Sequence, residues 1–97
     1  MNELLSKEYS WQYITASTVL CQDPCELVAL VSFPSDAGNE IDIYNGESTS
    51  AELVCKITSE VKRTVHITPP IHVYCSSGLY IVLKTNITGA FVQWRRV

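Results

Sequence analysis

Residues 25–46 read CELVALVSFPSDAGNEIDIYNG and contain two hydrophobic runs separated by a cluster of turn-forming residues. The first run, residues 25–33, is rich in leucine and valine, and the second, residues 40–44, alternates apolar with polar side chains. Short runs of this kind, bounded by Pro, Gly, Asn and Asp, are typical of β-strands rather than of helices. Asn45 and Gly46 tolerate the positive φ values that a tight turn requires. This stretch therefore predicts two consecutive strands.

Comparable runs recur along the rest of the chain, separated by turn residues at intervals of roughly eight to twelve positions, as in sandwiches and barrels. Pro69 and Pro70 remove two consecutive backbone donors, so the chain there must lie at a sheet edge or outside the sheet. The strands predicted in this way are residues 11–14, 17–21, 25–33, 40–44, 52–58, 63–68, 72–75, 79–84 and 90–95.

The length of the chain limits the number of domains. Ninety-seven residues are enough for one domain with one core. No tryptophan lies between the cysteines, as an immunoglobulin topology would require. We therefore predict an all-β protein, an antiparallel, jelly-roll-like β-sandwich of about eight short strands. Residues 1–10 are expected to form an N-terminal arm, and residues 11–97 the single domain.

Alternation along the strands assigns one face of each to the core. Asp42 lies between two such positions and is expected to face solvent. Residues 27–31 and 79–83 are apolar on both faces, a pattern usual for strands that are covered on both sides. In so short a chain, the second cover is expected to come from another subunit. The predicted core residues are Leu27, Ala29, Val31, Phe33, Ile41, Ile43, Leu53, Cys55, Ile57, Val65, Ile67, Val73, Cys75, Leu79, Ile81 and Leu83.

The charges are few and unevenly distributed. The net charge of −3 argues against a nucleic-acid partner. Residues 1–60 contain all ten acidic residues and two lysines, whereas residues 61–97 contain five basic residues and no acid. Either strands from the two halves interleave and neutralise one another, or patches of opposite sign meet between subunits and set their orientation.

The four cysteines do not form a recognisable site. Cys21 and Cys25 have the spacing of a zinc-ligand pair, but a second pair is missing. A disulfide between these two residues, across the intervening turn, would need an oxidising compartment. The favoured interpretation is that Cys55 and Cys75 are small buried hydrophobic residues. We therefore expect no metal and no cofactor.

No pattern in the chain predicts catalysis. His66 and His72 lie in apolar strands, and neither is accompanied by a nucleophile motif or an orienting third group. No glycine-rich phosphate loop is present. Residues 86–88 match the N-glycosylation acceptor pattern, a tripeptide that also arises often by chance. We expect a protein that is not an enzyme, with no catalytic residues and no small-molecule substrate.

The first eight residues lack the basic start and apolar stretch of a signal peptide. No run reaches the length of a transmembrane helix. We therefore expect synthesis in the cytosol and no membrane partner.

Aromatic and basic residues gather near the two ends of the predicted domain. Tryptophan, tyrosine and arginine are enriched at interface hot spots because they bury large areas while still making polar contacts. The alternative is that the two tryptophans belong to the core. We predict that the terminal strands carry subunit contacts through Trp11, Tyr13, Trp94, Arg95 and Arg96.

Four short motifs, in this order, resemble a kind of small β-sandwich protein found among the virion genes of tailed bacteriophages, many of which are labelled structural or decoration proteins. The resemblance covers roughly residues 14–94. Family members often have glycine where this chain has Asp23, and residues 1–10 and the strand after Asn45-Gly46 match nothing in the family. The motifs are Asp23-Pro24-Cys25-x-Leu27, Ile41-x-Ile43-Tyr44-Asn45-Gly46-x-Ser48, Ile67-Thr68-Pro69-Pro70 and Cys75-x-x-Gly78-Leu79-Tyr80.

The resemblance implies a virion structural protein that decorates the capsid or belongs to a connector, spike or fibre. Such a subunit would assemble in the host cytoplasm as a homo-oligomer, a trimer or a ring. It would bind the major capsid protein or other virion proteins and cement them by its binding free energy. The alternative is a non-viral β-sandwich module that recognises carbohydrate or protein through exposed aromatic residues, for which Tyr74, Tyr80 and Trp94 are candidates.

Overall fold

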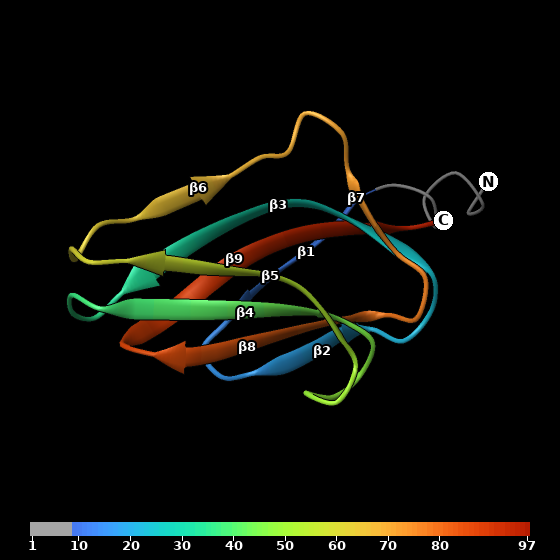
Figure 1. The fold of residues 1–97 in the computed structure, drawn as a ribbon. Coiled ribbons are helices and arrows are strands. Elements are labelled where there is room, and N and C mark those ends of the chain that lie inside the picture. Colours follow the sequence, from blue (N-terminus) through green and yellow to red (C-terminus); the bar gives the residue numbers. More distant parts are fainter. Residues whose placement is uncertain (1–8) are drawn as a thin grey trace.

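The hydrophobic runs of the sequence pair into nine antiparallel strands in the computed structural model, which describes residues 9–97 (Figure 1). Every strand predicted from the sequence is present, with its ends within three residues of the expected positions. The strands are β1 (Ser10–Ile14), β2 (Thr18–Cys21), β3 (Cys25–Pro34), β4 (Asn39–Asn45), β5 (Glu52–Ser59), β6 (Val65–Ile67), β7 (Val73–Cys75), β8 (Leu79–Thr85) and β9 (Ile87–Arg96).

The strands form two sheets that pack face to face (Figure 1). The five-stranded sheet has the order β1-β9-β3, followed by β6 and β7, which both pair with β3. The four-stranded sheet has the order β2-β8-β4-β5. This is the strand order of a jelly roll in which β6 and β7 together take the place of one strand. The predicted antiparallel, jelly-roll-like β-sandwich is confirmed.

The break between β6 and β7 lies at the two prolines. β6 pairs with residues 30–32 of β3, and β7 with residues 25–27. Between them the chain bows away from the sheet (Figure 1), and Ile71 at this bow is 83% exposed. The two prolines thus stand outside the sheet, as predicted, because neither can donate a backbone hydrogen bond.

A β-bulge at Val28 changes which face of β3 is buried. Leu27 pairs with Trp94 of β9, but Ala29 pairs with Gln93, the next residue along, so Val28 has no partner in β9. One extra residue reverses the alternation of the side chains that follow it. The strict alternation expected for residues 25–33 therefore fails beyond Leu27.

The bulge corrects the predicted core at three positions. Beyond it, the buried residues are Leu30 and Ser32, which are 0% and 2% exposed. Ala29 and Val31 are only half-buried, and Phe33 is 38% exposed. These three residues lie on the outer face of the five-stranded sheet instead of in the core.

A second register shift affects β5, which is an edge strand. Cys55 and Leu53 pair with consecutive residues of β4, so Val54 is the extra residue here. Leu53 and Cys55 are exposed, contrary to the prediction that both belong to the core. Ile57 is half-buried and packs against the core as expected.

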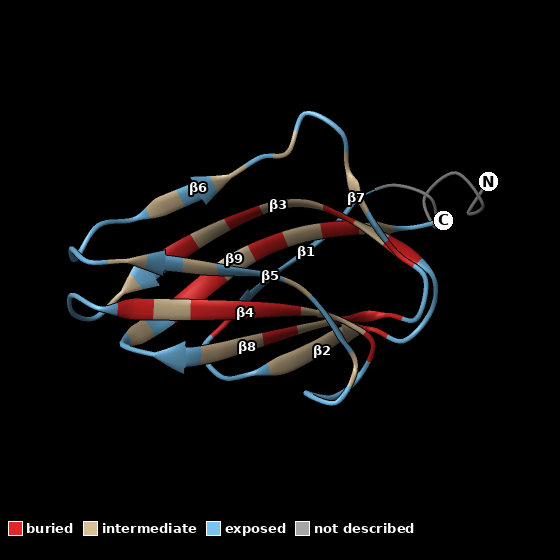
Figure 2. Ribbon diagram, viewed as in Figure 1, coloured by how far each residue is buried: buried red, intermediate tan, exposed pale blue. Residues whose placement is uncertain are grey.

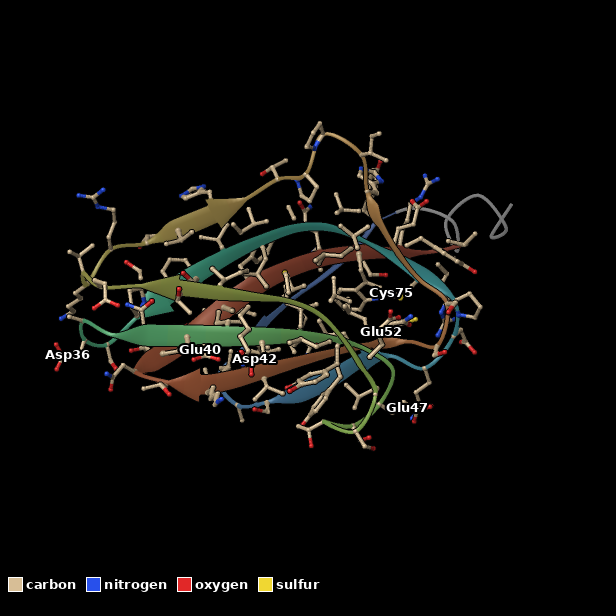
Figure 3. All side chains as sticks on the ribbon, in the orientation of Figure 1. Asp36, Glu40, Asp42, Glu47, Glu52 and Cys75 are labelled. Atoms are coloured by element: carbon tan, nitrogen blue, oxygen red, sulfur yellow. The ribbon has the colours of Figure 1, made fainter. Side chains whose placement is uncertain are left out.

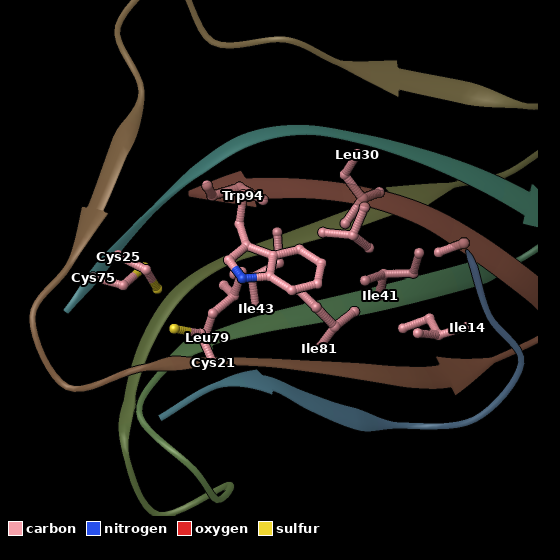
Figure 4. Packing of buried hydrophobic residues seen from close by; sticks show 13 residues of the cluster. Ile14, Cys21, Cys25, Leu30, Ile41, Ile43, Cys75, Leu79, Ile81 and Trp94 are labelled. Carbon is pink, nitrogen blue, oxygen red and sulfur yellow. The ribbon is translucent and has the colours of Figure 1, made fainter. Parts of the chain in front are cut away.

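The core lies between the two sheets, with the indole of Trp94 at its centre (Figure 4). Trp94 is only 8% exposed. Figure 2 shows the buried residues concentrated along β3, β4 and β9. Residues 1–8 of the predicted N-terminal arm lie outside the described residues, and its last residue begins β1. The buried hydrophobic residues are Ile14, Cys21, Cys25, Leu27, Leu30, Ile41, Ile43, Cys75, Leu79, Ile81, Ala90, Val92 and Trp94.

Candidate interaction surface

Large aromatic side chains project from the outer face of the five-stranded sheet. Trp11, Tyr13 and Phe33 are 66%, 47% and 38% exposed, and Phe91 is half-buried between them. Tyr13 stands directly opposite Phe91 in the register of β1 and β9. We call these four residues the aromatic face.

The rings of the aromatic face contact one another in pairs. The centroids of Trp11 and Phe91 are 5.8 Å apart with an interplanar angle of 32°. Those of Tyr13 and Phe33 are 5.9 Å apart at 64°, an edge-on arrangement. Aromatic pairs are favourable at centroid separations of about 4.5–7 Å. Each exposed ring is therefore held in place by a neighbour on another strand.

Gly89 allows side chains of β1 and β3 to meet across β9, which lies between these two strands. It pairs with Phe33, so a side chain at this position would stand on the outer face. A β-carbon at Gly89 would lie 2.6 Å from Cζ of Tyr13 and 2.9 Å from the carbonyl oxygen of Ile14, distances too short for real contacts. The missing side chain lets the Tyr13 ring lie over the backbone of β9 and reach Phe33.

The central part of this sheet face carries no charge. The residues that share its rows are Gln93 and Ala29 beside Trp11, and Val31 beside Phe91, with His66 of β6 at the far end of the second row. A partner that covers these rows from β1 to β3 would bury rings, aliphatic groups and one amide without removing a charged group from water, which is the expensive step in burying polar surface.

A charged cluster bounds the aromatic face and is neutralised within the chain. Oε1 of Glu26 accepts a hydrogen bond from Nε of Arg95 at 3.1 Å and lies 3.2 Å from Nδ1 of His72. The guanidinium carbon of Arg95 is 5.7 Å from the ring centroid of Tyr9, a cation–π contact. Arg95 is thus fixed by partners in its own chain.

The five residues predicted for subunit contacts separate in the structure. Trp11 and Tyr13 lie on the aromatic face, and Arg95 lies at its boundary. Trp94 points into the core because alternate residues of β9 face opposite sides, which corrects its assignment to a surface. Arg96 is exposed at the end of β9.

Sequence reasoning missed Phe33 and Phe91 as members of this surface. Phe33 was assigned to the core by strict alternation, which the bulge in β3 invalidates. Phe91 and Val92 are consecutive apolar residues, so the sequence does not show which of the two faces the core. The only local signal for either residue was its aromatic character.

The residues considered for a carbohydrate site do not come together. Tyr74 is 56% exposed on β7, at the edge of the five-stranded sheet. Tyr80 is half-buried on the four-stranded sheet, where its ring centroid is 6.1 Å from that of Tyr44. Trp94 lies in the core.

The outer face of the four-stranded sheet has a different character. Glu40, Asp42, Lys56 and Lys84, which we call the charged face, come from three neighbouring strands. Nζ of Lys56 is 3.1 Å from Glu40 and 3.5 Å from Asp42, and Nζ of Lys84 is 3.6 Å and 3.9 Å from the same two carboxylates. Figure 3 shows the two acids along β4.

Asp42 was expected to face solvent, but it is only 2% exposed. It does project from the outer face, and the long side chains of Lys56 and Lys84 cover it. Its Oδ1 has no hydrogen-bond partner. Burial raises the pKa of Asp42 above its usual value, and the neighbouring Glu40 raises it further. The hydrogen bond with Asp42, followed by the one with Lys56, lowers the pKa of Glu40.

Several of the unequal charges of the two halves of the chain are paired within one molecule. Glu40 and Asp42 meet Lys84, and Glu26 meets Arg95. Each of these contacts joins an acid from residues 1–60 to a basic residue from 61–97. The first interpretation of the charge distribution, interleaved strands, accounts for them.

Residues 9–97 contain no group of three or more His, Cys, Asp and Glu side chains placed to hold a metal ion. This part of the chain has no surface pocket. It has no helix of the length and hydrophobicity needed to span a bilayer.

Neither a family model, nor a curated protein, nor a solved structure matches this chain. The strand order and the surface therefore define it: a jelly-roll β-sandwich with an exposed aromatic face on one sheet and a self-neutralised charged face on the other.

Proposed function

We propose that this chain is a structural subunit that binds other protein subunits through its aromatic face, as a virion component of the tailed-bacteriophage kind. The observation that carries the proposal is the group of exposed, uncharged aromatic side chains on one sheet face, with Trp11 66% exposed. Contiguous exposed apolar patches on soluble proteins commonly mark interaction sites.

The energetics of the aromatic face favour a protein partner. Tryptophan and tyrosine supply much of the binding energy at interfaces, because their large rings lose water while few rotatable bonds are frozen. Trp11 and Tyr13 are already held by Phe91 and Phe33, which reduces the entropy lost when a partner covers them.

The virion role rests on the resemblance of the four sequence motifs, and the jelly-roll topology is compatible with it. Jelly rolls recur in viral capsid and lectin domains. A subunit that binds only an assembled shell stabilises that shell by its binding free energy. The partners would be further copies of the chain, as a trimer or a ring, and the major capsid protein or another virion protein.

A carbohydrate-recognition module is the second candidate, and the exposed indole of Trp11 is the observation in its favour. Flat rings can stack on flat ligands as well as pack against protein. Both functions would use the same residues, so a substitution cannot distinguish them. The experiment must compare different ligands.

The test removes rings from the aromatic face without disturbing the core. Trp11→Ala and Tyr13→Ala are compared with Tyr74→Ala, a control at a 56%-exposed aromatic residue at the β7 edge of the same sheet, opposite Glu26 and not one of the four rings. Sedimentation velocity over a concentration series measures self-association, and co-sedimentation with particles of the virus that encodes the gene measures binding to the shell.

We expect Trp11→Ala to weaken association at least tenfold, a loss of about 1.4 kcal/mol, and Tyr74→Ala to leave it unchanged. A wild-type chain that stays monomeric and does not bind particles would contradict the proposal. Glycan binding by such a monomer, lost in Trp11→Ala, would establish the second candidate instead.

A further inference from the structure

Three thiols from three strands meet at one end of the core. Cys21, Cys25 and Cys75 are 4%, 0% and 0% exposed. They come from β2, β3 and β7, so both sheets contribute. Figure 4 shows them grouped beyond the indole of Trp94, with Cys25 and Cys75 side by side. This cluster plays no part in the proposed function.

The pairing of β3 with β7 makes Cys25 and Cys75 direct partners. The two residues stand opposite each other in antiparallel register, and both side chains point into the core. Directly opposed residues in antiparallel strands have Cα atoms about 4.5–5.5 Å apart. Disulfides span Cα separations of about 4.4–6.8 Å, so the backbone already has a suitable spacing.

Cys21 is the competing partner: its thiol is close enough to Cys25 to hydrogen-bond with it and raise its pKa, but it faces Cys25 across the two sheets and not across paired strands. It lies in the other sheet, and its thiol donates to the carbonyl oxygen of Asp23 at 3.4 Å within the turn that leads to β3. Cys55 is exposed on an edge strand and is not paired with a strand that carries another cysteine. Of the four thiols, Cys25 and Cys75 are the only two that face each other across paired strands of the described chain.

We infer that Cys25 and Cys75 are an oxidation site, at which a small disulfide of the glutathione type converts the two thiols into a bond that fastens β7 to β3. The thiolate of one cysteine attacks the oxidant and releases one small thiol. The thiolate of the other attacks the resulting mixed disulfide, forms the Sγ–Sγ bond and releases the second small thiol. Two cysteine thiols are oxidised, and one small disulfide is reduced to two thiols.

The folded sandwich restricts when this reaction occurs. Burial, followed by the neighbouring Cys21, raises the pKa of the Cys25 thiol to about 12, so little thiolate is present while the core is closed. β7 is three residues long and pairs only with β3. It is also preceded by the exposed bow that contains Ile71. Local opening of β7 would therefore release Cys75 before the rest of the fold is lost.

The bond would act mainly on the unfolded chain. It would join positions 25 and 75 and so enclose the five strands from β3 to β7 in one covalent loop. Long closed loops give the larger gains, because more conformations are removed from the unfolded state. Oxidation would also hold the bow and the adjacent Glu26–His72 contact in place. None of this depends on the virion proposal.

The test starts from a Cys55→Ala chain, in which the exposed thiol cannot link molecules. The protein is equilibrated in graded mixtures of oxidised and reduced glutathione, the free thiols are alkylated, and a non-reducing peptide map identifies any bond. We expect a link between positions 25 and 75 and a rise in Tm of at least about 5 °C that a reductant reverses.

Two further variants keep the result interpretable. In the same background, Cys21→Ala should retain the link, and Cys75→Ala should lose it. Refolding each chain in the redox buffer gives the thiols access without relying on local opening. Two outcomes in the Cys55→Ala chain would overturn the inference. One is a link between positions 21 and 25, and the other is three free thiols after refolding under oxidising conditions.

Discussion

The two outer faces of the sandwich are built on the same kind of sheet but deal with their side chains in opposite ways. On the charged face, Asp42 is 2% exposed because two lysines cover it. On the aromatic face, Trp11 is 66% exposed although Phe91 lies beside it. One face pairs its charges within the chain, and the other leaves its largest side chains in water.

The register of the strands explains the difference. Asp42 stands directly opposite Lys56, so a charge meets its counter-charge between β4 and the edge strand β5. Tyr13 stands opposite Phe91, and Phe91 opposite Val31, so apolar groups meet across the five-stranded sheet. Apolar rows at a surface lose water only when something covers them. The aromatic face is therefore the part of this sandwich best suited to bind another molecule.

The largest expected effect comes from exchanging the two tryptophans in turn for alanine. Trp94→Ala leaves a cavity between the sheets and should lower the free energy of unfolding by about 3–5 kcal/mol. Trp11→Ala should change it by less than about 0.5 kcal/mol, because the ring is mostly in water. Urea unfolding followed by circular dichroism measures both. Equal losses would mean that Trp11 contributes as much to the free energy of unfolding as a core residue does.

A second variant tests how the aromatic face is held. Gly89→Ala places a methyl group against the ring of Tyr13 and should destabilise the fold by about 1–3 kcal/mol. The same change in a Tyr13→Ala background should be less damaging, since only the contact with the backbone of Ile14 remains. The difference, measured as a double-mutant cycle, reports the ring's position. An unchanged penalty would show that the backbone contact alone is responsible.

The smallest effect concerns the pH dependence of the charged face. The pKa of Asp42 is higher in the folded chain than its ordinary value of 3.8, so its contribution to stability is largest below that pH. This contribution is lost as the pH rises through the folded pKa. Relative to wild type, Asp42→Asn should therefore gain stability as the pH rises from below 3.8 through the folded pKa.

Glu40→Gln provides a control of opposite sign. The pKa of Glu40 is lowered in the folded chain, so its contribution is present above the ordinary value of 4.5 and is lost as the pH falls through the folded pKa. Glu40→Gln should lose stability relative to wild type as the pH rises. Urea midpoints over a pH series measure both variants. Parallel pH profiles for the two would contradict the opposing shifts.

The sequence predicted the strands well because each depends on local signals. Turn residues such as Asn45 and Gly46, and the apolar runs between them, are read without knowing the neighbouring strands. Which face of each strand is buried depends on its alignment with neighbouring strands, which the local sequence does not show. Val28 is a bulge only because of how β3 aligns with β9, some sixty residues further along the chain. That alignment placed Phe33 outside the core.

The candidate site was predictable only in part for the same reason. The identity of Trp11 and Tyr13 marked them as interface candidates, and both lie on the aromatic face. Nothing local shows whether the apolar side of β9 that carries Trp94 faces the core, as it does, or a partner subunit. The burial of Asp42 depends on Lys56 and Lys84, which only the sheet brings together.

The interruption between β6 and β7 also bears on how copies of this chain behave at high concentration. An intact border strand is a template onto which a foreign strand can add, and repeated addition leads to cross-β fibrils. Here that border of the five-stranded sheet offers two segments of three residues, parted by Pro69 and Pro70. An incoming strand finds no continuous row of free donors and acceptors along it. Molecules crowded together can then meet through their faces with little risk of polymerising along this border.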